Sequence, residues 1–189
     1  MITASVQLTP DVVLRPAVPA DAAGFARAYL RSRDHLRPWE PDRDDAFFTA
    51  AGQSERLRVL LAERDEGRGM PWALVRQEAG AERDIVGAIT LSGIVLGPLR
   101  SANVGYWIDP GQLGRGLASA ALTAVCAAAD GELHLHRLAA GTLLDNVASQ
   151  RVLAKCGFVE YGVAEEYLHI NGAWRARRLF QKILNDRRP

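Results

Sequence analysis

Residues 109–129 have the sequence DPGQLGRGLASAALTAVCAAA, which is the most informative segment of the chain about the fold. Its second half, from Ser119 to Ala129, is apolar on nearly every side of a helix, so we expect that helix to be buried against a sheet. Before it, glycines at 111, 114 and 116 let a ligand approach the backbone. The first amides of a helix lack intrahelical acceptors and carry the positive end of the helix dipole. The stretch therefore predicts a helix N-terminus suited to a phosphate or pyrophosphate.

The spacing of these glycines argues against two familiar nucleotide-binding motifs. A P-loop needs Gly-Lys-Ser/Thr, and the dinucleotide fingerprint needs a third glycine after the first strand of the chain. Arg115, between Gly114 and Gly116, adds a side-chain charge. Taken alone, the turn keeps a second interpretation, in which the glycines only lead the chain into the helix.

The segments on both sides of this stretch predict a mixed sheet flanked by helices. Short runs rich in Val, Ile and aromatic residues, separated by Gly, Asp and Pro, are typical of strands, and apolar residues at helical spacing predict helices. An Asn171-Gly172 pair predicts a hairpin between the last two strands. The expected order is β-α-α-β-β-β-α-β-α-β-β, of the α/β (mixed α+β) class. The strands are expected at 12–15, 72–76, 85–91, 103–108, 137–142, 164–170 and 174–183, and the helices after Pro19 and at 50–66, 119–129 and 145–155.

The composition predicts one ordinary globular domain spanning residues 1–189. With 48% hydrophobic and 24% charged residues, the chain can bury a core. Its 23 Lys and Arg against 22 Asp and Glu give a net charge of +1, so no global field attracts nucleic acid or a membrane surface. The first residues, MITASVQLTP, do not resemble a signal peptide, and no apolar window approaches a membrane span. We therefore expect a cytoplasmic protein.

The two cysteines, Cys126 and Cys156, lie in apolar helical stretches, which predicts small buried hydrophobic residues. Together with His134 and His136 they offer no zinc spacing, so we expect no metal site.

A second motif lies at the start of the helix expected at 145–155. Asn146 and Ser149 are three residues apart and share one helical face at its N-terminal end. By itself the pattern is explained by helix capping, with Asp145 or Asn146 as the N-cap. The combination of this motif with the glycine turn is much more specific than either one.

In chain order, four segments resemble the GCN5-related N-acetyltransferase (GNAT) superfamily. They are VGYWI at 104–108, GRGLA at 114–118 with its helix, HRL at 136–138, and Asn146-x-x-Ser149 running to Gly157-Phe158. Within the superfamily the chain is similar to the RimJ/RimL-type ribosomal-protein alanine N-acetyltransferases. That similarity takes in LRP at 14–16, DHLRPW at 34–39 and the segment from Tyr167 to Trp174, and so covers essentially the whole chain.

The resemblance implies the GNAT fold, a mostly antiparallel mixed sheet that splays between the fourth and fifth expected strands, 103–108 and 137–142. It also implies direct attack of a primary amine on acetyl-CoA, without a covalent enzyme intermediate. A protein N-terminal α-amine is the leading acceptor, since roughly a tenth of it is neutral near pH 7, against well under a thousandth of a lysine. The residues that the resemblance assigns to acetyl-CoA are Trp107, Ile108, Gly114, Arg115, Gly116, Leu117, Ala118, Ser119, Asn146 and Ser149.

The resemblance also implies roles on the acceptor side. Ser149 lies near the thioester sulfur, where its hydroxyl could protonate the leaving thiolate. Glu165 or Glu166 is the expected water-relayed base, with Glu40 and Asp109 as further candidates among which the sequence does not choose. The residues expected around the acceptor are His35, Trp39 and Glu40.

Departures from the family pattern keep other functions open. Leu113 and Leu153 stand where the superfamily often has a glutamine or arginine and a tyrosine, which leaves room for a non-catalytic acyl-CoA-binding module. A small amine is the other alternative acceptor. Arg177 and Arg178 follow Ala176, where the family often has an acidic residue, so an acidic acceptor is a further option. A homodimer is allowed by the resemblance alone, and a nucleic-acid partner is not expected.

Overall fold

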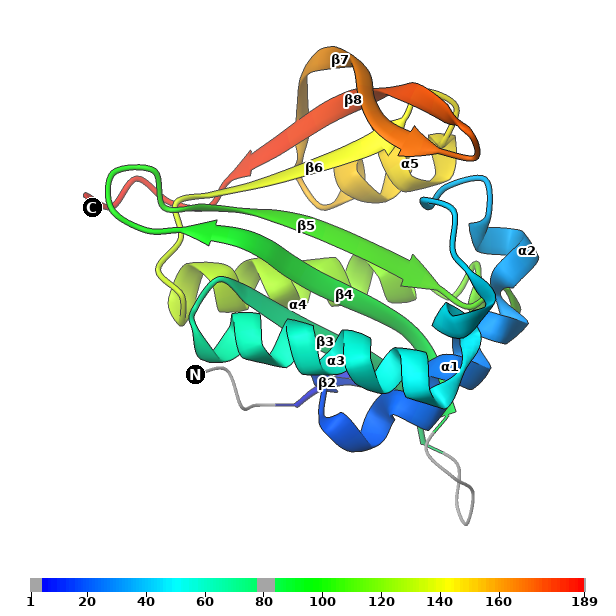
Figure 1. The fold of residues 1–189 in the computed structure, drawn as a ribbon. Helices are drawn as coiled ribbons and strands as arrows, with labels where there is room; N and C mark the ends of the chain where they lie inside the picture. The colour runs from blue at the N-terminus through cyan, green and yellow to red at the C-terminus, as the bar shows by residue number, and fades with distance from the viewer. Residues whose placement is uncertain (1–4, 78–83, 189) are drawn as a thin grey trace.

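The computed structural model describes residues 5–77 and 84–188, and one eight-stranded sheet forms its centre (Figure 1). The strand order is β1-β2-β3-β4-β5-β6-β8-β7. Neighbouring strands are antiparallel except β5 and β6, which are parallel. The expected mixed, mostly antiparallel sheet is confirmed. The strands are β1 (Val6–Thr9), β2 (Val12–Pro16), β3 (Gly69–Arg76), β4 (Asp84–Val95), β5 (Ser101–Ile108), β6 (Arg137–Leu143), β7 (Val159–Ile170) and β8 (Ala173–Ile183).

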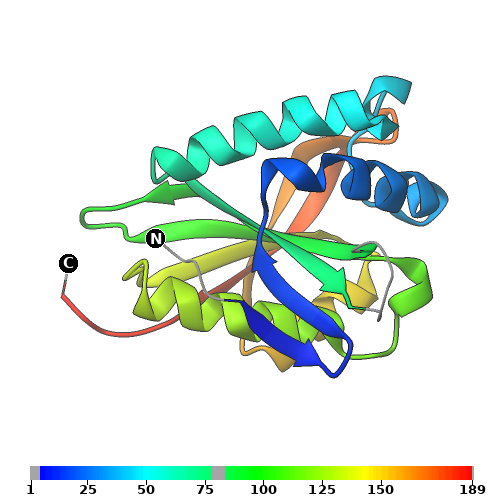
Figure 2. The ribbon, with the colours of Figure 1, turned by 90° about the horizontal axis from the view of Figure 1, so that it is seen from below.

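Helices cover both faces of the sheet. Figure 2 shows α1 and α3 on one face and α4 on the other, with the sheet between them. Side chains alternate along a strand, so successive residues of β5 belong to different cores. Trp107 packs into the core beneath α1 and α3, whereas Tyr106 and Ile108 pack into the core beneath α4 and α5. The helices are α1 (Ala22–Arg31), α2 (Arg33–Leu36), α3 (Ala50–Asp65), α4 (Leu117–Gly131) and α5 (Val147–Lys155).

The sheet splays between β5 and β6, the strands for which the resemblance implied it. These strands pair only from Ser101 to Asn103 and from Arg137 to Ala139. Beyond this point β6 continues to pair with β8 as far as Leu143, and β5 continues to pair with β4 as far as Ile108. Because β5 stays paired with β4 and β6 stays paired with β8, the two strands can diverge while the sheet remains continuous on each side. The edge of β5 that faces β6 is left unpaired from Val104 onward.

The buried helix and the closing hairpin follow the sequence expectation. α4 buries Leu117, Ala121, Leu122 and Val125, each at most 1% exposed. Both residues of the Asn171-Gly172 turn have positive φ, 49° and 77°, as a two-residue hairpin turn of this type requires. Both cysteines are buried and free, as expected. No helix within 5–77 and 84–188 is long and apolar enough to span a membrane.

Several elements differ from the expectation. β1 was not predicted, because its residues are partly exposed and it exists through pairing with β2. A single turn, α2, occupies the segment expected to be irregular. β7 begins at Val159 instead of 164, because register shifts between Glu160 and Gly162 and between Ala164 and Leu168 interrupt the alternation on which a strand prediction depends.

Candidate functional site

The candidate site is the gap between β5 and β6, at whose mouth α4 and α5 begin. The strand β5 ends at Ile108, and a short 3₁₀ turn (Pro110–Gln112) then leads to the glycines before α4. Asp109 fixes this turn, because its carboxylate accepts a hydrogen bond from Gly111 N at 2.8 Å and pairs with Arg31 Nε at 2.5 Å. Asp109 is 4% exposed, so its carboxylate serves the local structure.

The N-terminus of α4 is open. Its N-cap, Gly116, has φ +75°, a conformation that favours glycine, and no side chain caps the helix. The first bond of the helix runs from Ala120 N to Gly116 O, so the amides of Leu117, Ala118 and Ser119 have no acceptor within the helix. A Cβ atom at Gly114 or Gly116 would meet nothing within 4 Å. This turn can therefore present backbone amides to an anionic ligand.

A groove of about 550 Å³ lies against this end of α4. The N-cap Gly116 and two residues of α4, Ser119 and Thr123, line it together with Lys155 at the end of α5 and residues 6–8 of β1. The groove thus joins the open amides to a lysine from a second helix. Thr123 and Lys155 could not be assigned to the site from the sequence, because only the packing of α5 beside α4 brings them together.

Arg115 is held by ion pairing beside the glycines. Its guanidinium lies 2.5 Å from Asp11 Oδ1 and also donates to Gln112 Oε1. The hydrogen bond from Arg115 lowers the pKa of Asp11. Arg115 is therefore near the helix N-terminus, with its charge shared with a carboxylate.

The start of α5 faces β5 across the gap. Asn146 is the N-cap, and its Oδ1 accepts from Ser149 N at 3.0 Å. The Ser149 hydroxyl lies 2.9 Å from the hydroxyl of Tyr106 on β5. Burial raises the pKa of Tyr106 to about 12. The capping interpretation of Asn146 is therefore confirmed, while the contact between Ser149 and Tyr106 was not foreseen.

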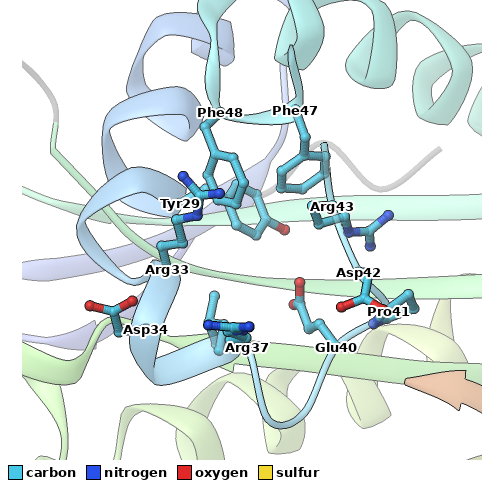
Figure 3. Close-up of a pocket in the computed structure, with 11 residues that line it drawn as sticks. Tyr29, Arg33, Asp34, Arg37, Glu40, Pro41, Asp42, Arg43, Phe47 and Phe48 are labelled. Carbon is cyan, nitrogen blue, oxygen red and sulfur yellow. The ribbon is translucent and has the colours of Figure 1, made fainter. Parts of the chain in front are cut away.

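A pocket of about 260 Å³ lies where α1, α2 and the following loop approach the end of β5 (Figure 3). The ring of Tyr29, in its wall, is 4.6 Å from that of Trp107, which places the pocket beside β5. Its lining is charged and aromatic. The lining residues are Tyr29, Arg33, Asp34, Leu36, Arg37, Glu40, Pro41, Asp42, Arg43, Phe47 and Phe48.

Glu40 points into this pocket, toward the hydroxyl of Tyr29 (Figure 3). Burial raises the pKa of Glu40, although Arg43 and Arg56 oppose the shift. Burial also raises the pKa of Tyr29 to about 12. The pocket therefore contains a desolvated carboxylate, a group that favours a cationic or hydrogen-bond-donating ligand.

Other residues assigned from the sequence lie outside this pocket. His35 and Trp39 are on the same segment as Glu40 but do not line the pocket. Glu165 and Glu166 are exposed in the irregular part of β7, an edge strand that β8 separates from β6. Within the described part of the chain, no hydrogen bond or ion pair joins either carboxylate to Ser149.

Tyr106 is the residue whose position sequence analysis could have found. It lies in the VGYWI segment, one residue before Trp107, and the alternation of a strand places it on the side of α4 and α5. What the sequence does not provide is the separation of β5 from α5, because that depends on how far β6 diverges.

Comparison with known proteins gives a consistent result. Residues 11–159 match the family described as acetyltransferase (GNAT) domain. The ribosomal protein uS5-alanine N-acetyltransferase of Escherichia coli (strain K12) is 33% identical over 171 residues, 90% of this chain and 87% of the relative. The solved ribosomal-protein-S5-alanine acetyltransferase from Vibrio fischeri has a TM-score of 0.92 at 33% identity, covering 98% of this chain and 100% of the other. Mycobacterium smegmatis RimJ, solved in complex with CoA-disulfide, has a TM-score of 0.84 at 34% identity, covering 91% and 81%.

Proposed function

The chain belongs to the acetyltransferase (GNAT) family and is an N-acetyltransferase, and from this premise we propose that it acetylates the N-terminal α-amine of a ribosomal protein. The supporting observation is the unpaired edge of β5, which faces a gap flanked by the N-termini of α4 and α5. In this proposal residues 1–189 act as one catalytic domain, and its work on ribosomal proteins places it in the cytoplasm.

Acetyl-CoA supplies the activated acetyl group as a thioester. The residues around the gap fit its chemistry, because the amides from Gly114 to Ser119 suit the pyrophosphate and Arg115 adds charge beside them. The backbone groups of Ile108 would pair with the pantetheine arm as a neighbouring strand does. The carbonyl oxygen of Trp107 instead faces Gly87 of β4, so the expected pairing through both residues is reduced to Ile108. Asn146 would contact the pantetheine end through its side-chain amide, whose oxygen already caps α5.

The chain's own groups then assist the attack of the amine. A backbone amide on the free edge of β5 donates to the thioester oxygen as negative charge develops there. The Ser149 hydroxyl would donate a hydrogen bond to the departing thiolate. Holding both reactants in the gap contributes up to roughly 7–11 kcal/mol when the attack geometry is kept.

Glu40 receives the acceptor amine in this proposal. Its carboxylate is partly buried and points into the pocket beside Trp107, so an approaching amine would restore the interactions lost on burial. His35 and Trp39 stay candidates for contact with the rest of the acceptor, because they lie on the same segment as Glu40. Glu165 and Glu166 stay candidates for a base that works through water.

A small amine is a second candidate acceptor, because one contact narrows the approach to the pocket. Asp42, in the loop after α2, accepts from Gly172 N of the β7–β8 turn at 3.1 Å. A loop that stays joined to this turn favours a small amine, whereas a loop that opens admits an extended peptide.

Titration calorimetry with acetyl-CoA, followed by a CoA-release assay with N-terminal peptides and small amines, tests the proposal. We expect binding in the micromolar range and CoA release that depends on the peptide. CoA release with small amines alone would indicate that the acceptor is a small amine and not a protein N-terminus. Binding without release under any condition would leave an acyl-CoA-binding module, and no binding would refute the proposed site.

A further inference from the structure

A pair of hydroxyl groups connects the two sides of the gap. Tyr106 Oη on β5 lies 2.9 Å from Ser149 Oγ on α5, where either oxygen can be the donor, and donates to the backbone oxygen of Ser149 at 3.3 Å. The 2.9 Å contact lies within the usual range for an O–H···O bond and the 3.3 Å contact lies beyond it. The two residues are 43 positions apart in the chain. Within the structure's described ranges, this is the side-chain hydrogen bond that joins β5 to the first turn of α5.

Both residues are held by contacts besides the hydrogen bond between their hydroxyls. The Tyr106 ring packs against the core beneath α4 and α5, and the next residue, Trp107, anchors the opposite face of β5 against Tyr29. Ser149 is fixed through its backbone, because its amide donates to Asn146 Oδ1. Each residue therefore has other contacts that hold it in place. The hydrogen bond between the hydroxyls can then act on the chemistry of the site as well as on its stability.

The effect on the chemistry concerns the direction of the protons. Burial raises the pKa of Tyr106 to about 12, so the phenol stays protonated wherever an α-amine of pKa about 7.7–8.0 becomes neutral. A serine oxygen that accepts from a phenol keeps its own proton for another acceptor. Leu153, one turn farther along α5, is 1% exposed in the core and offers no hydroxyl.

We propose that Tyr106 is a positioning residue that donates to Ser149 Oγ and so directs the Ser149 proton toward the sulfur of the leaving CoA. This inference rests on the proposed function. As the amine nitrogen bonds to the acetyl carbon and the carbon–sulfur bond breaks, Ser149 donates a hydrogen bond to the thiolate. The proton lost by the amine goes to the base or to water, and both hydroxyls keep their protons.

A double-mutant cycle tests the coupling. Tyr106→Phe removes the hydroxyl while keeping the ring, and Ser149→Ala removes the other hydroxyl. We expect Tyr106→Phe to lower kcat about 5- to 20-fold, with KM for acetyl-CoA changed less than about twofold. In the Ser149→Ala background the same substitution should cost nothing further. Equal losses in both backgrounds, or a Ser149→Ala enzyme with full kcat, would overturn the inference.

A binding experiment separates this inference from the proposed function, because it needs no acceptor and no turnover. CoA and desulfo-CoA, which lacks the sulfur, are titrated between pH 7 and 10. If the Ser149 proton points at the sulfur, CoA should gain affinity as its thiol ionises, and both Tyr106→Phe and Ser149→Ala should reduce that gain. Desulfo-CoA should bind all three proteins alike. Equal weakening for both ligands would assign Tyr106 a purely structural role, and failure of wild type to bind either would refute the site.

Discussion

The two sides of the gap present different chemical groups to a ligand. On the side proposed for acetyl-CoA, the groups that can contact a ligand are backbone amides and small residues around Gly114 and Gly116. On the side proposed for the acceptor they are charged and aromatic side chains, Glu40 and Tyr29 among them, from segments that meet only in the fold. Backbone recognition suits a cosubstrate that is always the same. Side-chain recognition can change with the acceptor while the rest of the site is kept.

The largest expected effect breaks the acetyl-CoA side. Gly116→Glu should abolish acetyl-CoA binding, weakening it by at least about 100-fold, because the carboxylate would lie against the pyrophosphate. Gly116→Gln is the matched control, since both side chains suffer the same strain at φ +75°. Calorimetry should show a much smaller loss for Gln. Equal losses would mean that strain, and not charge, is responsible.

The second-largest expected effect is on acceptor binding, with acetyl-CoA binding unchanged. Glu40→Gln should lower kcat/KM for the amine about 10- to 100-fold and leave acetyl-CoA binding unchanged. Asp34→Asn, an exposed change in the same pocket, serves as the control and should have little effect. A Glu40→Gln variant with normal peptide kinetics would remove Glu40 from the proposal.

Glu40 should also make the enzyme pH-dependent. Burial raises its pKa, so wild-type activity should fall on acidification above the ordinary glutamate pKa of about 4.3, and Glu40→Gln should lack this limb. The folded state binds this proton more tightly than the unfolded state. Protonated Glu40 therefore stabilises the folded state at low pH, and this contribution is lost as the pH rises through the pKa of Glu40 in the folded state. At pH 7 the charged carboxylate is unfavourable in its partly buried position, so Glu40→Gln should raise the free energy of unfolding. Urea-induced unfolding at several pH values measures this difference. A lower free energy of unfolding for Glu40→Gln than for wild type at pH 7 would contradict the prediction.

Asp109 connects the two sides, which gives a prediction about stability. Asp109→Ala should lower the free energy of unfolding by about 1–3 kcal/mol, because it removes the Gly111 bond and the Arg31 pair at a buried position. Arg31→Ala is the companion variant and should cost less, since that side chain is 42% exposed. Denaturant unfolding measures both, and an unchanged midpoint for Asp109→Ala would contradict this role.

The smallest expected effect tests how the ion pair with Asp11 influences the role of Arg115 in binding. Asp11→Asn should tighten acetyl-CoA binding roughly two- to threefold at low salt, because it frees the guanidinium from an exposed ion pair. The gain should disappear at high salt and in an Arg115→Gln background. Weaker binding by Asp11→Asn would indicate that the pair holds Arg115 in its working position.

The parts that could be predicted share a local physical cause. The apolar α4, the glycine turn and the Asn171-Gly172 hairpin each follow from residues close together in the chain. The parts that were missed depend on distant partners. β1 forms because β2 is beside it, and the shifts in β7 are hidden because each one reverses the alternation of side chains.

The family, the order of most elements and the glycine turn that opens onto a helix N-terminus could all be predicted from the sequence. Those features need only neighbouring residues, because helix periodicity and glycine conformations are local properties. Which side chains face the gap depends on the packing of segments that are distant in the chain. That packing brought Tyr106 to Ser149, placed Glu40 in the pocket, and gave Asp109 a structural role among the candidate carboxylates. These outcomes depend on how far β5 and β6 diverge and on how α1 and α2 pack, which no local pattern specifies.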